Sequence, residues 1–311
     1  MSSLMVFPGQ GAQQPHMLHR LPDEALVRDC LRQASDALGE EVLALDSVEA
    51  LADSRAVQLC LLIAGVACAR VLIERASVPD YVAGLSIGAY PAAVIAGSLA
   101  FGDAVRLVAL RGELMQSAYP HGYGMTAIMG LDQPAVEALI GQVHSPATPV
   151  YLANINADNQ WVIAGSESAM AAVAERAKNN GASAVKRLAV SVPSHCALLE
   201  QPAAALAEAF AKVSVQAPTL RYLSGSTARL VLTADKVRDD LAFNMCRVID
   251  WRGTVQTAYE RGVRLQIELP PGTVLTGLAR KVFEQGAAVA FQGARLDTLS
   301  ALLREEETRN P

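Results

Sequence analysis

One stretch of the sequence, residues 81–88, reads Tyr81-Val82-Ala83-Gly84-Leu85-Ser86-Ile87-Gly88. Its apolar start predicts a short buried strand, and the segment from Ile87 onward is predicted to be helical. A sharp strand-to-helix turn would push Ser86 out of the sheet, while the two glycines keep side chains away from the backbone. We therefore interpret Ser86 as a candidate nucleophile and the N–H of Ile87 as an oxyanion donor. The alternative is a glycine-rich helix entrance without a catalytic role.

Strand and helix patterns alternate on both sides of this stretch. A predicted strand at Leu4–Phe7 precedes a helical region that ends at Arg75, and further helices are predicted from Ile87 and from Asp103. Such alternation is typical of a parallel sheet covered by helices. The sequence therefore predicts an α/β fold whose large domain is hydrolase-like.

Glycines near residues 121–124 interrupt this alternation. A compact order of strand, helix, strand, strand, helix and strand follows, with predicted bounds 125–130, 134–143, 150–156, 161–165, 168–179 and 184–190. This is the order of a ferredoxin-like unit. We therefore predict a small ferredoxin-like subdomain over residues 123–191, inserted into a large catalytic domain formed by residues 1–122 and 192–311.

The composition excludes several classes of protein. The chain has 311 residues, is 51% hydrophobic and carries a net charge of −5. Without a long basic run, neither nucleic acid nor a membrane surface is expected as a partner. The most apolar stretch, 59–73, is short for a membrane span and contains Arg70, so a buried helix is predicted. Five scattered cysteines and the absence of a positively charged leader favour a cytoplasmic protein without a metal site.

A serine hydroxyl needs a neighbouring base, and histidine is the usual one. Of the five histidines, His195 alone follows a predicted strand and turn, at the sheet edge where α/β folds bind ligands. The other four have ordinary structural interpretations: His16, His19, His121 and His144. No acidic residue between Ser86 and His195 has an obvious triad position, so a dyad oriented by a backbone carbonyl is plausible.

The predicted helix from Asp103 carries an arginine in its apolar stripe. Positions 104, 107, 108, 111, 114, 115 and 118 share one face, and Arg111 is the one charged residue among them. Arg106 points to the opposite side. A buried guanidinium needs an anion, so Arg111 pairs either with a protein carboxylate or with a carboxylate on the substrate.

The loop after the first predicted strand, Pro8–Gln14, contains two glycines around Gln10. It lacks the G-x-G-x-x-G pattern and the Walker lysine, which argues against nucleotide binding. Its glycines would let the backbone approach a ligand on the same sheet edge as Ser86. A tight turn without a functional role is the alternative.

Together these segments resemble the malonyl-CoA:acyl-carrier-protein transacylases over nearly the whole chain. The motifs that carry the resemblance are residues 7–13 (FPGQGAQ), 84–88 (GLSIG), 111–116 (RGELMQ), 190–198 (VSVPSHCAL) and 274–278 (VLTGL).

The resemblance implies the chemistry and the site. Malonyl-CoA would be the substrate, the thiol arm of an acyl carrier protein the acceptor, and no cofactor or metal would be bound permanently. The implied site residues are Ser86 as nucleophile, His195 as base, Arg111 as binder of the malonyl carboxylate, Gln10 with the Ile87 N–H as oxyanion hole, and the main chain of Asn244 as the group that orients the histidine.

Two residues beside the serine depart from the usual family pattern, which has histidine and glutamate where this chain has Leu85 and Ala89. The resulting Gly-Leu-Ser-Ile-Gly-Ala sequence is similar to the epsilon subunit of bacterial malonate decarboxylase. That similarity implies priming of malonate decarboxylase, whose carrier subunit bears a modified dephospho-coenzyme A. The alternatives are a fatty-acid or polyketide transacylase and, from other classes, a serine thioesterase or an inactive carrier-docking subunit.

Overall fold

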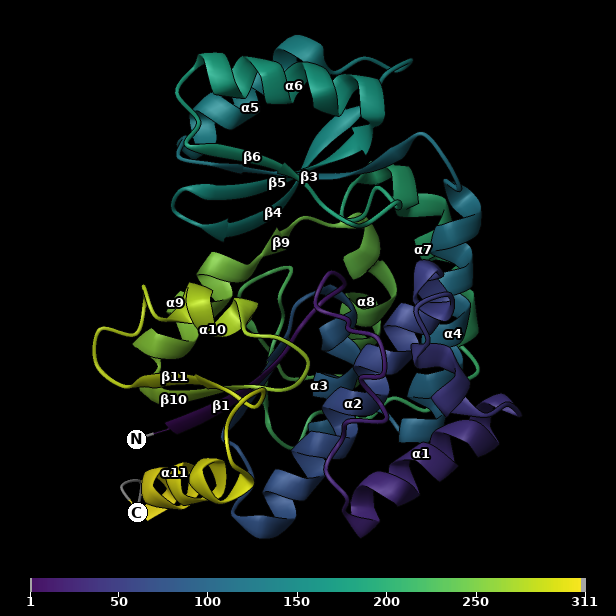
Figure 1. Cartoon of the computed structure of the whole chain (residues 1–311), viewed down its shortest axis with the longest axis vertical. Coiled ribbons are helices and arrows are strands. Elements are labelled where there is room, and N and C mark those ends of the chain that lie inside the picture. The colour runs from purple at the N-terminus through teal and green to yellow at the C-terminus, as the bar shows by residue number, and fades with distance from the viewer. Residues whose placement is uncertain (1, 309–311) are drawn as a thin grey trace.

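The computed structural model describes residues 2–308, which form two β-sheets with helices packed around each (Figure 1). Residue 1 and residues 309–311, which the predicted domain bounds include, lie outside the described part. The predicted α/β class is confirmed, with both parallel and antiparallel strand pairs present.

The larger sheet contains six strands. Their order across the sheet is β11 (Ala287–Ala290), β10 (Val263–Glu268), β1 (Ser2–Phe7), β2 (Tyr81–Gly84), β7 (Arg221–Leu223) and β8 (Leu230–Val231). All neighbouring pairs are parallel except β7 and β8, which form an antiparallel edge. The expected parallel sheet is therefore mixed at one edge. Phe7 pairs with Gly84, so the loops after β1 and β2 leave the sheet side by side.

Helices cover both faces of this sheet. The side chains of Leu4 and Val6 pack against α9 and α10, whereas Met5 and Phe7 pack toward α2, α3 and α11. This two-sided burial explains why β1 is apolar throughout. The helices of the large domain are α1 (Ala25–Leu38), α2 (Ser54–Arg75), α3 (Ala89–Ile95), α4 (Phe101–Ala118), α7 (Glu200–Phe210), α8 (Ala234–Phe243), α9 (Trp251–Glu260), α10 (Val274–Ala279) and α11 (Leu296–Thr308).

Helix α2 forms the centre of the large core. Within residues 2–308 it is the one helix long and apolar enough to cross a membrane, yet 89% of its apolar window is buried inside the protein. The prediction of a buried helix over 59–73 is therefore confirmed. Helix α4 packs against α2 and begins at Phe101, two residues before the predicted start at Asp103.

The smaller sheet lies above the larger one in Figure 1, with α5 (Gln133–Val143) and α6 (Glu167–Asn179) on its outer face. Its strands, in spatial order, are β6 (Ala184–Arg187), β3 (Tyr123–Met129), β5 (Gln160–Ser166), β4 (Val150–Ala157) and β9 (Ile249–Asp250). The predicted order of strands and helices between residues 123 and 187 is confirmed. The inner face of the sheet packs against Cys196, so the junction with the large domain lies beside His195.

Two details of the smaller sheet differ from the sequence-based expectation. Strand β6 ends at Arg187 instead of residue 190, and near this end the Arg187 guanidinium donates to the carbonyl of Tyr123 at 2.8 Å. Strand β9 comes from the second half of the chain and pairs in parallel with β4. Only two residues form it, which is too short for any periodic signal in the sequence.

Candidate active site

Ser86 lies on the turn that follows β2. The strand ends at Gly84, a single 3₁₀ turn covers Ser86–Gly88, and α3 begins at Ala89 instead of at the predicted Ile87. Ser86 has a φ of 59°, which non-glycine residues rarely adopt. A Cβ on Gly88 would lie 2.1 Å from the carbonyl oxygen of Phe7, so only glycine lets the turn approach β1 this closely.

His195 lies in the loop between β6 and α7 and is only 3% exposed. Its Nδ1 lies 2.8 Å from the main-chain oxygen of Asn244, and its own N–H donates to the Met245 carbonyl at 2.6 Å. Within residues 2–308 its ring has no carboxylate partner. Burial is the main cause that lowers the pKa of His195 to about 4; the Asn244 carbonyl opposes this shift, and the nearby positive charge of Arg111 adds to it. The ring is therefore neutral at pH 7 and free to accept a proton.

Arg111 projects from the buried face of α4 and has no measurable exposure. Its Nη1 donates to Gln58 Oε1 at 2.6 Å, and its Nη2 donates to Asn244 Oδ1 at 3.1 Å and to Ser86 Oγ at 3.4 Å. Its Nε is buried and has no hydrogen-bond partner among residues 2–308. Burial lowers the pKa of Arg111 to about 10, so the side chain stays charged at neutral pH.

The partners of Arg111 distinguish between its two sequence-based interpretations. Every partner is neutral, and no carboxylate of the described residues lies within ion-pair distance of the guanidinium. The internal salt bridge that the sequence left open is therefore absent from this part of the chain. A buried cation with an unused N–H is a site for an external anion.

Asn244 connects the other three groups. Its main-chain oxygen contacts His195, its Oδ1 accepts from Arg111, and its Nδ2 donates to the main-chain oxygen of Ser86 at 3.3 Å. The side chain thus fixes the guanidinium and the serine turn relative to the histidine. The sequence resemblance implied only its main-chain contact.

Gln58, on α2, is a site residue that sequence reasoning missed. Besides accepting from Arg111, it donates through Nε2 to Gln10 Oε1 at 3.2 Å and to the sulfur of Met115 at 3.4 Å. Gln58 thus links Gln10 to the buried arginine, and the amide N–H₂ of Gln10 donates no hydrogen bond within residues 2–308. The available sequence signal was a polar amide directly before the apolar stretch 59–73, at a position predicted to be buried with it.

Ser86 and His195, the predicted nucleophile and base, share Asn244 as a partner but do not hydrogen-bond to each other within the described residues. Catalytic hydrogen bonds are often long before substrate binds, so the lack of a direct hydrogen bond between Ser86 and His195 is compatible with proton transfer in the substrate complex. The N–H of Ile87 also makes no hydrogen bond within residues 2–308 and follows Ser86 at the start of the turn. It is available to a developing oxyanion.

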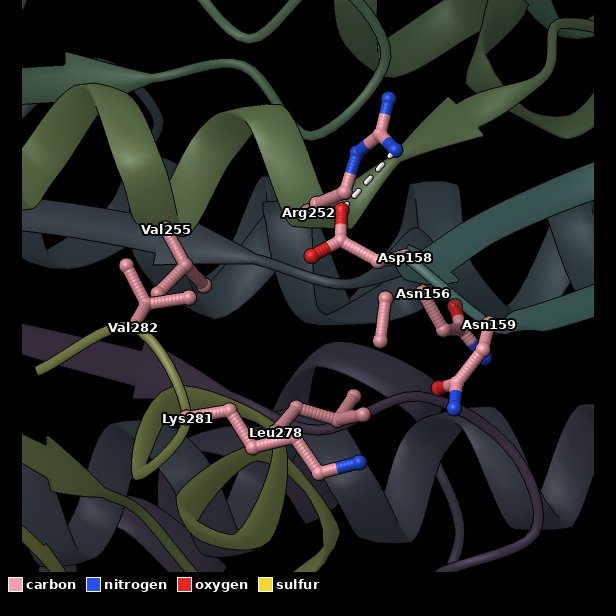
Figure 2. Close-up of a pocket in the computed structure, with 9 residues that line it drawn as sticks. Asn156, Asp158, Asn159, Arg252, Val255, Leu278, Lys281 and Val282 are labelled. Atoms are coloured by element: carbon pink, nitrogen blue, oxygen red, sulfur yellow. Dashed lines mark hydrogen bonds and ion pairs between the residues drawn. The ribbon is translucent and has the colours of Figure 1, made fainter. Parts of the chain in front are cut away.

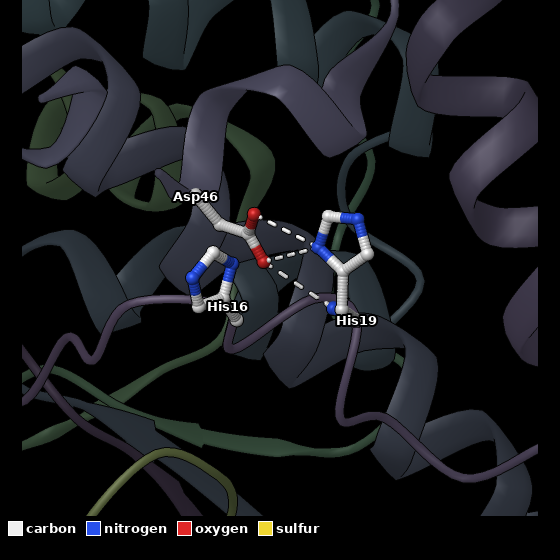
Figure 3. A group of neighbouring side chains, drawn as sticks. All are labelled: His16, His19 and Asp46. Carbon is white, nitrogen blue, oxygen red and sulfur yellow. Dashed lines mark hydrogen bonds and ion pairs between the residues drawn. The ribbon is translucent and has the colours of Figure 1, made fainter. Parts of the chain in front are cut away.

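Three other histidines and one cavity belong to other parts of the molecule. His144 caps α5, as expected, while His16 and His19 lie beside Asp46 (Figure 3). A cavity of about 250 Å³ lies between the β4–β5 turn and helices α9 and α10, with Arg252 and Asp158 paired at 3.2 Å on its wall (Figure 2). None of the predicted catalytic residues lines this cavity.

Comparison with known proteins identifies the class of this chain. The acyl transferase domain family matches residues 4–308. The malonyl CoA-acyl carrier protein transacylase of Escherichia coli K12 is 38% identical over 297 residues, covering 92% of this chain and 94% of that protein. The fold and these matches define the chain as an acyltransferase.

Solved structures agree in fold. The malonyl CoA-acyl carrier protein transacylase of Coxiella burnetii superposes with a TM-score of 0.92 at 33% identity, covering 98% of both chains. A malonyl transacylase in complex with its type II polyketide synthase acyl carrier protein superposes with a TM-score of 0.91 at 35% identity, covering 98% of this chain and 100% of that one. The chain belongs to the malonyl-CoA:acyl carrier protein transacylase family.

Proposed function

We propose that the enzyme transfers a malonyl group from malonyl-CoA to the thiol of an acyl carrier protein through an ester on Ser86. The observation that carries the proposal is the buried guanidinium of Arg111, which has an unused Nε and no anionic partner among residues 2–308. A malonyl half-thioester brings a free carboxylate of the charge and planar shape that a guanidinium binds in a bidentate manner.

The reaction runs in two symmetrical halves. His195 removes the proton from the Ser86 hydroxyl, whose oxygen attacks the thioester carbonyl, and coenzyme A leaves with the proton that His195 returns to its sulfur. The thiol of the carrier then attacks the malonyl ester and restores the serine hydroxyl. The Asn244 carbonyl holds the imidazole in the tautomer whose Nε2 accepts the proton, because Nδ1 carries the hydrogen that this carbonyl accepts.

Charge develops on the thioester oxygen in both halves. The Ile87 N–H and the Gln10 amide are its donors, and Gln58 holds Gln10 in place at 3.2 Å. Arg111 holds the malonyl carboxylate away from the reacting carbonyl, which favours transfer over decarboxylation and selects malonyl over acetyl groups.

We assign the acceptor to the carriers of fatty-acid or polyketide assembly. The curated relatives are named as malonyl CoA-acyl carrier protein transacylases, and one similar structure is a complex with a polyketide carrier. Priming of malonate decarboxylase remains the second candidate. Its support is the Leu85 and Ala89 pair around the serine, which resembles the epsilon subunit of that enzyme.

A chase experiment separates these acceptors. Malonyl-enzyme, formed with radiolabelled malonyl-CoA and freed of coenzyme A, is mixed with holo-carriers bearing either phosphopantetheine or the dephospho-coenzyme A arm. Preferential transfer to the phosphopantetheine carrier is expected, and preferential transfer to the other arm would favour decarboxylase priming. Release of free malonate at the same rate with and without carrier would instead indicate a thioesterase.

We also propose that residues 123–191 form a ferredoxin-like subdomain on a hydrolase-like domain of residues 1–122 and 192–311. The antiparallel order β6-β3-β5-β4, with two helices on one face, supports this division. The five cysteines are free, which suits a cytoplasmic enzyme.

A further inference from the structure

Three side chains that commonly bind metal ions lie close together, two from the segment after the Gln10 loop and one from a later 3₁₀ helix (Figure 3). His16 and His19 lie in a turn, and Asp46 ends the 3₁₀ helix Val42–Asp46. One ligand atom from each residue lies within 4.8 Å of the other two. No local sequence pattern predicts a metal site here, because Asp46 is 27 residues from His19.

The carboxylate of Asp46 is rigidly held. Its side chain is 1% exposed, and its Oδ2 accepts the N–H of Leu18 at 2.8 Å and that of His19 at 3.3 Å. Among residues 2–308, Oδ1 then has the ring of His19 as its single hydrogen-bond partner. A carboxylate fixed in this way is oriented before any ion arrives.

The ring of His19 faces this carboxylate. Its Nδ1 lies 3.0 Å from both Asp46 oxygens, while half of the His19 side chain is exposed to solvent. Two atoms with facing lone pairs at this distance need a proton or a metal ion to hold them together. With metal–ligand bonds of about 2.0–2.2 Å, neighbouring ligands of one ion lie about 3 Å apart. The observed spacing therefore accommodates either occupant.

His16 supplies the observation that favours a ligand. Its φ is 61°, its N–H donates to the Asp46 carbonyl at 2.8 Å, and its ring lies edge-on to that of His19 at 5.9 Å. The ring makes no hydrogen bond within residues 2–308. Glycine adopts this backbone conformation without strain, so a histidine here bears a conformational cost to which its ring, with no hydrogen bond among the described residues, contributes no compensation.

We propose that His16, His19 and Asp46 bind a divalent transition-metal ion, with water in the remaining positions. Two imidazoles and a carboxylate suit zinc, cobalt or nickel. The three ligand atoms already lie within 4.8 Å of one another, so the exposed His16 ring has only a short distance to close on a shared ion. The ion would tie the segment after Gln10 to the Val42–Asp46 turn and stabilise the folded enzyme. This site is separate from malonyl transfer and does not rest on it.

Zinc titration of the metal-free full chain tests the proposal, by calorimetry and thermal unfolding. We expect one ion per chain and, at zinc 100-fold above its Kd, a rise in Tm of about 5 °C. In the absence of metal, His16→Gly should unfold at the same or a higher temperature than wild type, because glycine relieves the strain. The same variant, like His19→Gln, should lose the zinc-dependent rise.

His16→Gly should keep or raise the Tm of the metal-free enzyme but lose the rise in Tm with zinc, so the two measurements separate metal binding from a general change in stability. A wild type that binds no zinc would overturn the proposal. Equal zinc affinity in wild type and both variants would overturn it as well, because the ion would then lie elsewhere, for example on the free thiols. Both readouts are independent of acyl transfer, so they stand whatever the outcome for the proposed reaction.

Discussion

Replacing Arg111 with methionine removes the charge from the site but keeps an unbranched side chain on the buried face of α4. Wild-type Arg111 is fully buried, and its Nη groups donate to Gln58, Asn244 and Ser86. In Arg111→Met these acceptors lose a donor, while the cost of burying an unpaired guanidinium also disappears. The two effects oppose each other, so we expect a folded enzyme whose Tm is close to that of wild type.

The effect on substrate selection should be much larger. Loss of one partner from a buried charge pair costs about 2–5 kcal/mol, which corresponds to about 30-fold to several thousand-fold in kcat/KM for malonyl-CoA. Acetyl-CoA has no carboxylate and should lose far less. The assay measures coenzyme A release with both thioesters in the presence of a holo-carrier protein, which allows turnover.

Arg106→Met provides a matched control on the same helix. Arg106 is exposed on the opposite face and pairs with Asp103 at 2.7 Å, an interaction worth at most about 1 kcal/mol. This variant should keep the wild-type preference for malonyl groups. If Arg111→Met kept that preference as well, Arg111 would not be the carboxylate-binding group.

Three further predictions follow from neighbouring contacts. Asn244→Ala keeps the main-chain carbonyl at His195 but loses both side-chain hydrogen bonds. The kcat/KM for malonyl-CoA should therefore fall about 5- to 50-fold, with a smaller loss for acetyl-CoA. Equal losses for the two thioesters would contradict a role in carboxylate binding. The pKa of His195 is about 4 in the folded enzyme, so as pH falls below about 6.5 this histidine becomes protonated in the unfolded chain before it does in the folded one. Urea unfolding should therefore show that the free energy of unfolding falls by roughly 3 kcal/mol by pH 4. His195→Gln should lack this loss. Gly88→Ala would put its Cβ 2.1 Å from the Phe7 oxygen and should lower Tm strongly. The control Gly141→Ala lies in open space on α5 and should raise Tm slightly. Equal changes in Tm would contradict the tight turn at Gly88.

Local patterns in the sequence predicted the serine turn and the buried arginine. The predicted strand at the apolar start of residues 81–88 is observed as Tyr81–Gly84, because an apolar run between turn residues has few other ways to bury itself. Arg111 was found from a helical stripe, since periodicity of 3.6 residues decides which side chains face the core. Both signals depend on neighbours within about one or two helical turns.

Contacts between distant segments carried no such signal. Gln58 lies 53 residues from Arg111, and Asn244 lies 133 residues from it, so no local pattern joins them. The partner of His195 is a main-chain oxygen, which every residue has, and only the family resemblance indicated its position. The two-residue strand β9 is likewise defined by the strand beside it.

The most direct test of covalent transfer through Ser86 is the intact mass of the enzyme after brief exposure to malonyl-CoA, with Ser86→Ala and acetyl-CoA as controls. We predict one malonyl group on wild type, none on Ser86→Ala, and little acetyl adduct under the same conditions. An adduct of equal yield on Ser86→Ala, or wild type that stays unmodified while transfer to carrier proceeds, would contradict the ester mechanism.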